Sequence, residues 1–190
     1  LAPEVNFLAP PKNKGRGTLH LEYEAKDDYG LSNLRLIVQH NQGWLLPNSK
    51  NYSALKLPIA KSDGGVWNGS VTHDFSKHPW AGVLVKVSLL AVDGIGQESG
   101  TDKIAIALPE RIFNQPVARK LVAARKILNR PDDRAITEAI LDLKIISEHP
   151  KHFYDDTIVF IALSLAQARL RHDRSLQARG DVQSILWETA

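Results

Sequence analysis

Apolar and polar residues alternate along several short segments in the first half of the chain. Residues 19–25 change from apolar to polar at every position, which is typical of a β-strand with one buried face. The same alternation predicts strands at residues 34–38 and 83–89, and further strands are predicted at residues 66–71, after Gly64 and Gly65, and 103–108, after the tight connection at residues 93–96. Because Gly, Asp and Pro residues separate these segments, we predict an antiparallel β-sandwich of immunoglobulin type over residues 1–108. The chain has no cysteine, which excludes an antibody-type domain and favours a fibronectin-like or bacterial immunoglobulin-like sandwich.

From Pro109 onward the apolar spacing changes to that of helices. Val117, Leu121 and Leu128 fall on one face of a predicted helix, which Asn114 caps. Three further helices are predicted: after the caps Asp132 and Asp133, from Thr157 to about Arg171 behind Asp155 and Asp156, and from about Ser175 towards Trp187. Since the connections are short, residues 109–190 are predicted to form a small α-helical bundle of about four helices.

The longest apolar run starts at Ile158 and continues to Ala168. Asp156 and Arg169 bound it, and a membrane-spanning helix needs about 20 apolar residues. We therefore predict a buried helix at this place and not a membrane span.

Charge and composition exclude several classes of function. The chain has 190 residues, 24 basic and 21 acidic, with a net charge of +3, and it has no basic run. We therefore expect no nucleic-acid partner. The absence of cysteine excludes disulfides, thiol nucleophiles and Cys-based zinc sites. The absence of methionine, including an initiator, predicts a fragment or processed form of a longer protein.

No motif in the sequence indicates catalysis or a cofactor. His73 and His78 flank Asp74 near Ser70 and Ser76, but sequence proximity does not supply the geometry of a catalytic triad. There is no Gly-x-Ser-x-Gly elbow, phosphate loop or dinucleotide fingerprint. We therefore assign no catalytic residue and no cofactor.

Two clusters have the residue types of metal ligands. His149, His152, Asp155 and Asp156 lie close together, but His149 is placed to end one helix and the aspartates to cap the next. The acidic turns at residues 26–30 and 93–96 lack the alternating spacing of a calcium loop, and Asp residues stabilise turns. We assign no metal ligand, and a metal-dependent enzyme remains an alternative.

Aromatic residues supply the candidates for an interface or a ligand site. They are Trp44, Trp67, Trp80, His78 and Tyr52, and Tyr52, in a polar stretch, is the aromatic residue that we most expect to be exposed. Exposed tryptophans on a sandwich could stack on sugars, whereas tryptophan is more often buried. Trp80 follows Pro79 and precedes Gly82, just before a predicted strand. We therefore interpret Trp80 as a side chain that closes one end of the sandwich.

Five strings identify a family resemblance. They are residues 25–32, 74–82, 91–97 and 108–113, followed by 116–119. In this order they resemble long α-proteobacterial membrane proteins that contain a domain of unknown function. The most specific strings are His-Pro-Trp-Ala-Gly from His78 and Leu-Pro-Glu-Arg-Ile-Phe from Leu108.

The resemblance implies a place for this chain but no reaction. Such proteins have membrane helices near the N-terminus and a large extracytoplasmic region with a Gln/Gly-rich tail, and this chain is similar to a middle piece of that region. We therefore expect a soluble segment of a membrane-anchored parent, on the periplasmic side of the inner membrane. The leading hypothesis is a non-enzymatic structural or protein-interaction module whose partner is another envelope protein. The first alternative is a module that binds peptidoglycan or another glycan.

Overall fold

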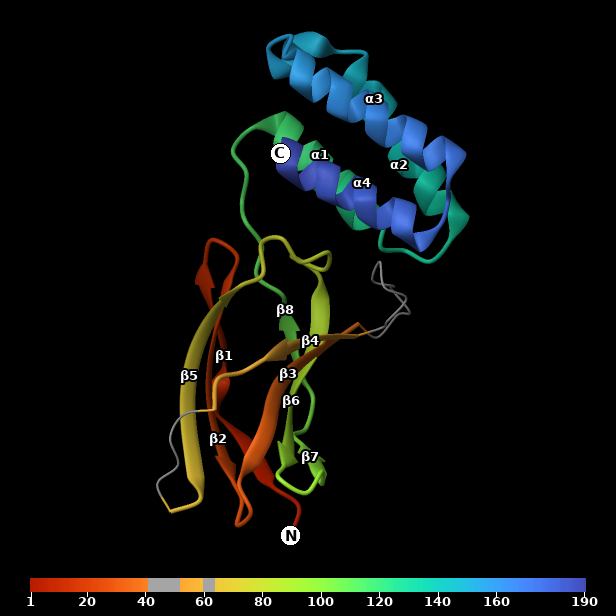
Figure 1. The fold of residues 1–190 in the computed structure, drawn as a ribbon. Coiled ribbons are helices and arrows are strands. Elements are labelled where there is room, and N and C mark those ends of the chain that lie inside the picture. The colour runs from red at the N-terminus through yellow and green to blue at the C-terminus, as the bar shows by residue number, and fades with distance from the viewer. Residues whose placement is uncertain (41–51, 60–63) are drawn as a thin grey trace. The chain divides into compact units, whose positions relative to one another are not determined.

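The computed structural model describes residues 1–40, 52–59 and 64–190 (Figure 1). They fall into two compact units, an all-β unit that ends at Arg111 and a helical unit from Ile112 to Ala190. The strands are β1 (Glu4–Gly15), β2 (Thr18–Lys26), β3 (Leu31–Gln39), β4 (Tyr52–Lys56), β5 (Val66–Asp74), β6 (Leu84–Asp93), β7 (Glu98–Gly100) and β8 (Ile104–Ala107). The helices are α1 (Pro116–Ile127), α2 (Asp133–Ser147), α3 (Thr157–His172), α4 (Leu176–Thr189) and the short 3₁₀ helix η1 (Pro150–Phe153).

The strands of the β unit form two antiparallel sheets. The three-stranded sheet has the order β1-β2-β5, and the five-stranded sheet has the order β4-β3-β6-β7, with β8 also paired to β6. β3 pairs along one edge of β6, while β8 pairs with residues 84–87 of β6 and β7 with residues 90–92. The two short strands therefore follow one another along the second edge of β6.

The predicted alternation places one face of each central strand in the core. In β2, the side chains at positions 19, 21, 23 and 25 are at most 1% exposed. The same holds for positions 34, 36 and 38 of β3. In β6, the side chains at positions 85, 87, 89 and 91 are at most 2% exposed. Burying one large apolar side chain stabilises a fold by about 1.5–3 kcal/mol. The strand predictions for these segments are confirmed, and this buried face fixes the register of both sheets.

The sequence pattern misses three of the outer strands, β1, β4 and β7, whereas it predicts the outer strands β5 and β8. β1 contains Pro10 and Pro11, which cannot donate to a ladder and normally argue against a strand. The structure accommodates them because β1 is an edge strand and its pairing with β2 shifts register between Phe7 and Ala9, and again before Lys12. β4 and β7 are also outer strands, and they are short.

The helical unit is a ring of four packed helices, as predicted. α1 packs on α2, α2 on α3, α3 on α4, and α4 on α1. Asp132, Asp156 and Ser175 each accept a hydrogen bond from a backbone N–H in the first turn of α2, α3 and α4. The predicted cap Asn114 is wrong: Gln115 is the N-cap of α1 and makes no side-chain capping bond, and Pro116 follows it as the first helical residue.

The prediction that the whole run from Ile158 to Ala168 is buried is wrong. Leu163 and Ala166 are fully buried in the core of the ring, whereas Ile158 and Ile161 are 78% and 59% exposed. The reason is geometric, since a helix in a ring of four presents only one face to its neighbours. Within the described ranges, no helix has the length and apolar character needed to cross a membrane.

Candidate functional site

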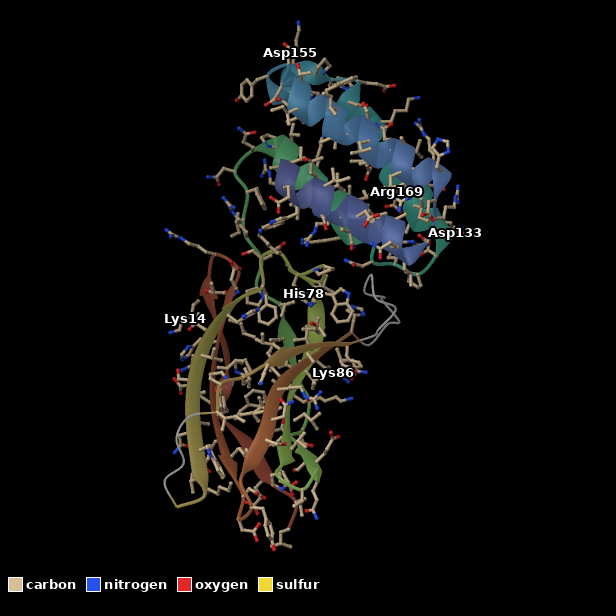
Figure 2. The ribbon with its side chains drawn as sticks, viewed as in Figure 1. Lys14, His78, Lys86, Asp133, Asp155 and Arg169 are labelled. Carbon is tan, nitrogen blue, oxygen red and sulfur yellow. The ribbon has the colours of Figure 1, made fainter. Side chains whose placement is uncertain are left out.

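The segment His78–Gly82 connects β5 to β6 and folds into tight turns at one end of the β unit, where Figure 2 labels His78. The N–H of His78 donates to the C=O of Phe75 at 2.9 Å. The N–H of Gly82 donates to the C=O of Leu108 at 2.8 Å, just beyond β8. The segment is thus held by a turn bond within the β5–β6 connection and by a bond to the residue that follows β8.

Short side chains at the end of β5 start these turns. The carboxylate of Asp74 accepts a hydrogen bond from the backbone N–H of Ser76 at 2.7 Å, and a second from the Ser76 hydroxyl. These bonds hold the pKa of Asp74 below its ordinary value. Asp74 is therefore a charged residue that shapes the backbone, which is the usual role of an Asp residue in a turn.

Four aromatic rings gather behind these turns, and we call them the His–Trp cluster: His40, Phe75, His78 and Trp80. The ring centroids of His78 and Trp80 are 5.5 Å apart, those of His40 and Trp80 5.9 Å, and those of Phe75 and His78 5.8 Å. The planes are tilted or near perpendicular, as aromatic pairs prefer. Two separate parts of the chain contribute to the cluster: His40 directly follows β3, and the other three rings lie in the connection between β5 and β6.

The His–Trp cluster lies in an apolar environment that disfavours charge. His40 is 8% exposed, and burial lowers the pKa of its imidazole. A neutral His40 is therefore the dominant form at pH 7. The backbone N–H of Trp80 donates a hydrogen bond to Nδ1 of His78 at 3.1 Å. Nδ1 of His78 therefore acts as an acceptor and carries no proton.

Trp80 is 0% exposed, so its ring cannot stack on a ligand from solvent. Its position agrees with the interpretation of a side chain that closes one end of the two sheets. The segment His78–Gly82 is therefore a structural element, because its turns and the aromatic rings of the His–Trp cluster are built around a buried indole.

The other aromatic candidates do not join this cluster. Trp67 lies on the outer strand β5, half-buried, opposite Ala25 of β2. Tyr52 begins β4 and is 39% exposed, less than Tyr29 at 63% and Tyr154 at 82%. Tyr52 is therefore exposed, as expected, although Tyr29 and Tyr154 are more exposed. Trp44 lies outside the described residues.

The residues with metal-ligand chemistry serve local structure. His149 and His152 stack at 5.3 Å, and the Nδ1 of His149 is 2.8 Å from the C=O of Ile145. Asp156 accepts from the N–H of Ile158 at the start of α3. In the residues the structure describes, no group of three or more His, Asp or Glu side chains is arranged to hold a metal ion.

The acidic turns of the β unit are also occupied by backbone donors. One oxygen of Asp93 accepts hydrogen bonds from the N–H groups of Ile95 and Gln97, at 2.9 and 2.8 Å. Asp27 accepts from the N–H of Tyr29 at 2.9 Å. Both carboxylates therefore do what the sequence interpretation expected of an Asp residue in a turn.

A surface that the sequence interpretation missed lies on the outside of α3. We call it the outer seam of α3, and it consists of Ile158, Ile161, Leu165, Ala168 and His172. The three large apolar residues are 78%, 59% and 55% exposed, and Ala168 and His172 are also exposed. The signal was present in the sequence, because the spacing of three and four residues places all five on one face. It was hidden because the opposite face of the same helix is apolar as well.

Charged residues crowd the connection between α1 and α2. Arg179 of α4 is 7% exposed at its side chain and donates to the C=O of Arg130 at 2.6 Å. It also lies 3.4 Å from the carboxylate of Asp133, which Figure 2 labels at the start of α2. Arg130 in turn pairs with Asp132 and Glu138. This network holds the α1–α2 connection against α4.

The comparisons with known proteins give a family and no activity. The model of one family, described as a domain of unknown function (DUF4175), matches residues 1–190. No curated protein matches the chain.

Among solved structures, the chain is similar to Astrotactin-2, described as a conserved vertebrate-specific and perforin-like membrane protein involved in neuronal development. The identity is 12% and the TM-score 0.36, and the alignment covers 99% of this chain. The chain spans only 37% of the length of that structure. A similarity this low supports no conclusion about fold or function.

Proposed function

Because the chain belongs to the family of domains of unknown function DUF4175, we propose its function from the geometry of its two units: it is a non-enzymatic protein-interaction module. One observation carries the proposal, namely the outer seam of α3. This seam exposes three large apolar side chains in line on a folded helix. Exposed apolar surface of this kind marks a site of protein contact.

We further propose that the β unit is an immunoglobulin-like sandwich of fibronectin type that acts as a rigid scaffold. The strand order supports this: β1-β2-β5 corresponds to the A-B-E sheet, and β4-β3-β6, with β7 and β8 on its edge, corresponds to C′-C-F-G. The β7–β8 pair then represents one interrupted G strand. The closure of one end by Trp80 fits a scaffold role, because it rigidifies the connection between β5 and β6.

The place of action follows from the family resemblance. We propose that the module lies on the periplasmic side of the inner membrane, as part of a membrane-anchored envelope protein. The partner is then a protein that presents a complementary apolar helix or groove. Helices are recognised in this way through apolar anchors spaced by three and four residues.

Site-specific photo-crosslinking in the parent protein tests the proposal. A photoreactive residue replaces Ile161 at the centre of the outer seam, and the expected result is a covalent adduct with a protein. The matched control is Ala123, which is also exposed but lies on α1. We expect no adduct from this position.

Two results would contradict the proposal. One is the absence of a protein adduct at Ile161 in cells that express the parent protein. The other is hydrolase activity of the purified chain on envelope polymers. The second would replace the interaction module by an enzyme, whatever the crosslinking shows.

A further inference from the structure

The outer seam of α3 has the spacing of a coiled coil. Its members at positions 158, 161, 165, 168 and 172 are separated by three, four, three and four residues. This is the a and d pattern of a heptad, with Ile158, Leu165 and His172 at a, and Ile161 and Ala168 at d. Such a seam packs on a second helix through interdigitating side chains.

The face opposite the seam is already used. Leu163, Ala166 and Leu170 are 0% exposed and belong to the core of the helical unit. α3 is therefore apolar on two opposite sides, one covered by α2 and α4 and one open. A helix that is hydrophobic all round is normally buried all round. We therefore expect that another helix covers the seam when the protein is bound to its partner.

We propose that the occupant of the seam is a second copy of this chain, paired antiparallel through α3. The inference rests on the proposed function, since it names the partner of the interaction module. A two-fold axis crosses the seam at the level of residue 163 and relates the two helices. Ile161 then faces Leu165 of the second copy, and Ile158 faces Ala168. Each pair joins an a position to a d position, as antiparallel packing requires, and the smallest seam residue meets one of the largest.

Charge at the two ends of α3 favours this direction of pairing. Asp155 and Asp156 precede the helix, while the exposed Arg171 and His172 lie in its last turn. Arg169 lies in the same turn but is paired with Asp173 and Asp181 of its own chain. Figure 2 shows Asp155 and Arg169 towards opposite ends of α3. In an antiparallel pair, the acidic end of each copy meets the basic end of the other. In a parallel pair, like charges would meet at both ends.

The dipoles of the two helices act in the same sense. Each helix has a partial positive charge at its N-terminus and a partial negative charge at its C-terminus. Antiparallel pairing places these opposite charges next to one another. Opposite charges therefore lie together at both ends of the pair when the partner is a second copy of α3.

Sedimentation equilibrium of the 190-residue chain tests the inference. The wild-type chain is expected to form dimers with rising concentration, and Ile161→Asp is expected to weaken the association at least tenfold. The matched control is Ile145→Asp on α2, where the original side chain is 51% exposed but lies outside the seam. This variant is expected to dimerise as the wild type does. Far-UV circular dichroism of both variants verifies that the helices are formed.

The result separates this inference from the proposed function. A wild-type chain that stays monomeric at all concentrations overturns the second copy as occupant, and so does a dimer that Ile161→Asp leaves intact. If in that case the crosslinker at Ile161 captures a different protein, the interaction module stands with another partner. If it captures none, both proposals fail.

Discussion

The backbone N–H of Trp80 donates a hydrogen bond to the imidazole of His78, and the two ring centroids lie 5.5 Å apart. This bond joins two residues of the same connection between β5 and β6. The connection therefore fixes the backbone of Trp80, and with it the position of the indole, without help from another element. Pro79 separates the two and restricts His78 to extended conformations. This local arrangement explains why a short string can close one end of the β unit.

Truncation of Trp80 is expected to destabilise the β unit strongly. Trp80→Ala removes a side chain that is 0% exposed and leaves a cavity, so the free energy of unfolding should fall by about 3–5 kcal/mol. Chemical denaturation followed by circular dichroism of the sheet measures it. Trp67→Ala is the control, since Trp67 is only half-buried, and it should cost less. Equal costs would contradict the closing role of Trp80.

His40 should make stability depend on pH. Burial lowers the pKa of His40 below its ordinary 6.5, so the unfolded chain takes up a proton at higher pH than the folded chain. The free energy of unfolding is therefore highest above the pKa that His40 has in the unfolded chain. It falls as the pH drops below that pKa, with a slope of at most about 1.4 kcal/mol per pH unit. Denaturation from about pH 7.5 to about pH 5.5 should show a flatter profile for His40→Gln than for the wild type.

The control for this pH profile is His152→Gln, because His152 is exposed in the helical unit. Its profile should follow that of the wild type. An unchanged slope in His40→Gln would show that other groups cause the pH dependence.

Gly82 has a left-handed backbone conformation, and there is no free space for a side chain at its position. Its φ is +74°, and the carboxylate of Glu110 occupies the place of a Cβ atom. Gly82→Ala should cost the roughly 1–2 kcal/mol of a left-handed backbone, together with the cost of displacing the flexible end of Glu110. Gly96→Ala is the control, since Gly96 has φ +90° and no atom within 4 Å.

A double-mutant cycle isolates the contact with Glu110. The cost of Gly82→Ala should be smaller in the background Glu110→Ala, because the clash is removed and only backbone strain remains. Thermal denaturation of the four proteins supplies the comparison. An additive cycle would show that Glu110 moves aside without cost.

Arg179 should stabilise the helical unit through its bond to the backbone. Arg179→Met keeps most of the apolar contact but removes the bond to the C=O of Arg130, so it should cost about 1.5–3 kcal/mol. Arg174→Met changes an exposed arginine next to the same helix and should have little effect. Urea denaturation followed at the helical signal measures both. Similar stabilities would mean that the bond contributes nothing.

The central elements could be predicted because one face of each is buried. The alternation around Leu21 and Val87 and the helical spacing of Val117 and Leu121 follow directly from burial. The edge strand β1 could not be predicted, because its prolines are allowed only by its outer position and its irregular register. That position depends on pairings between distant parts of the chain.

The candidate sites divide in the same way. The closing role of Trp80 was accessible from Pro79 and Gly82, which constrain the backbone locally. The outer seam of α3 was not, because Ile158 and Leu163 are both apolar and the sequence does not say which one the other helices cover. Only the packing of four helices distinguishes them.

Disulfide trapping tests the antiparallel pairing of α3 most directly, since the chain has no cysteine of its own. In the proposed pair, residue 158 of one copy lies opposite residue 168 of the other. The two copies of residue 158 are therefore about 15 Å apart along the helix axis, and so are the two copies of residue 168, whereas a disulfide needs Cα atoms within about 7 Å. The double variant Ile158→Cys with Ala168→Cys is therefore expected to form covalent dimers under mild oxidation. Each single variant alone should remain unlinked. Efficient linking of the single variants, or no linking of the double variant, would contradict the proposed pairing.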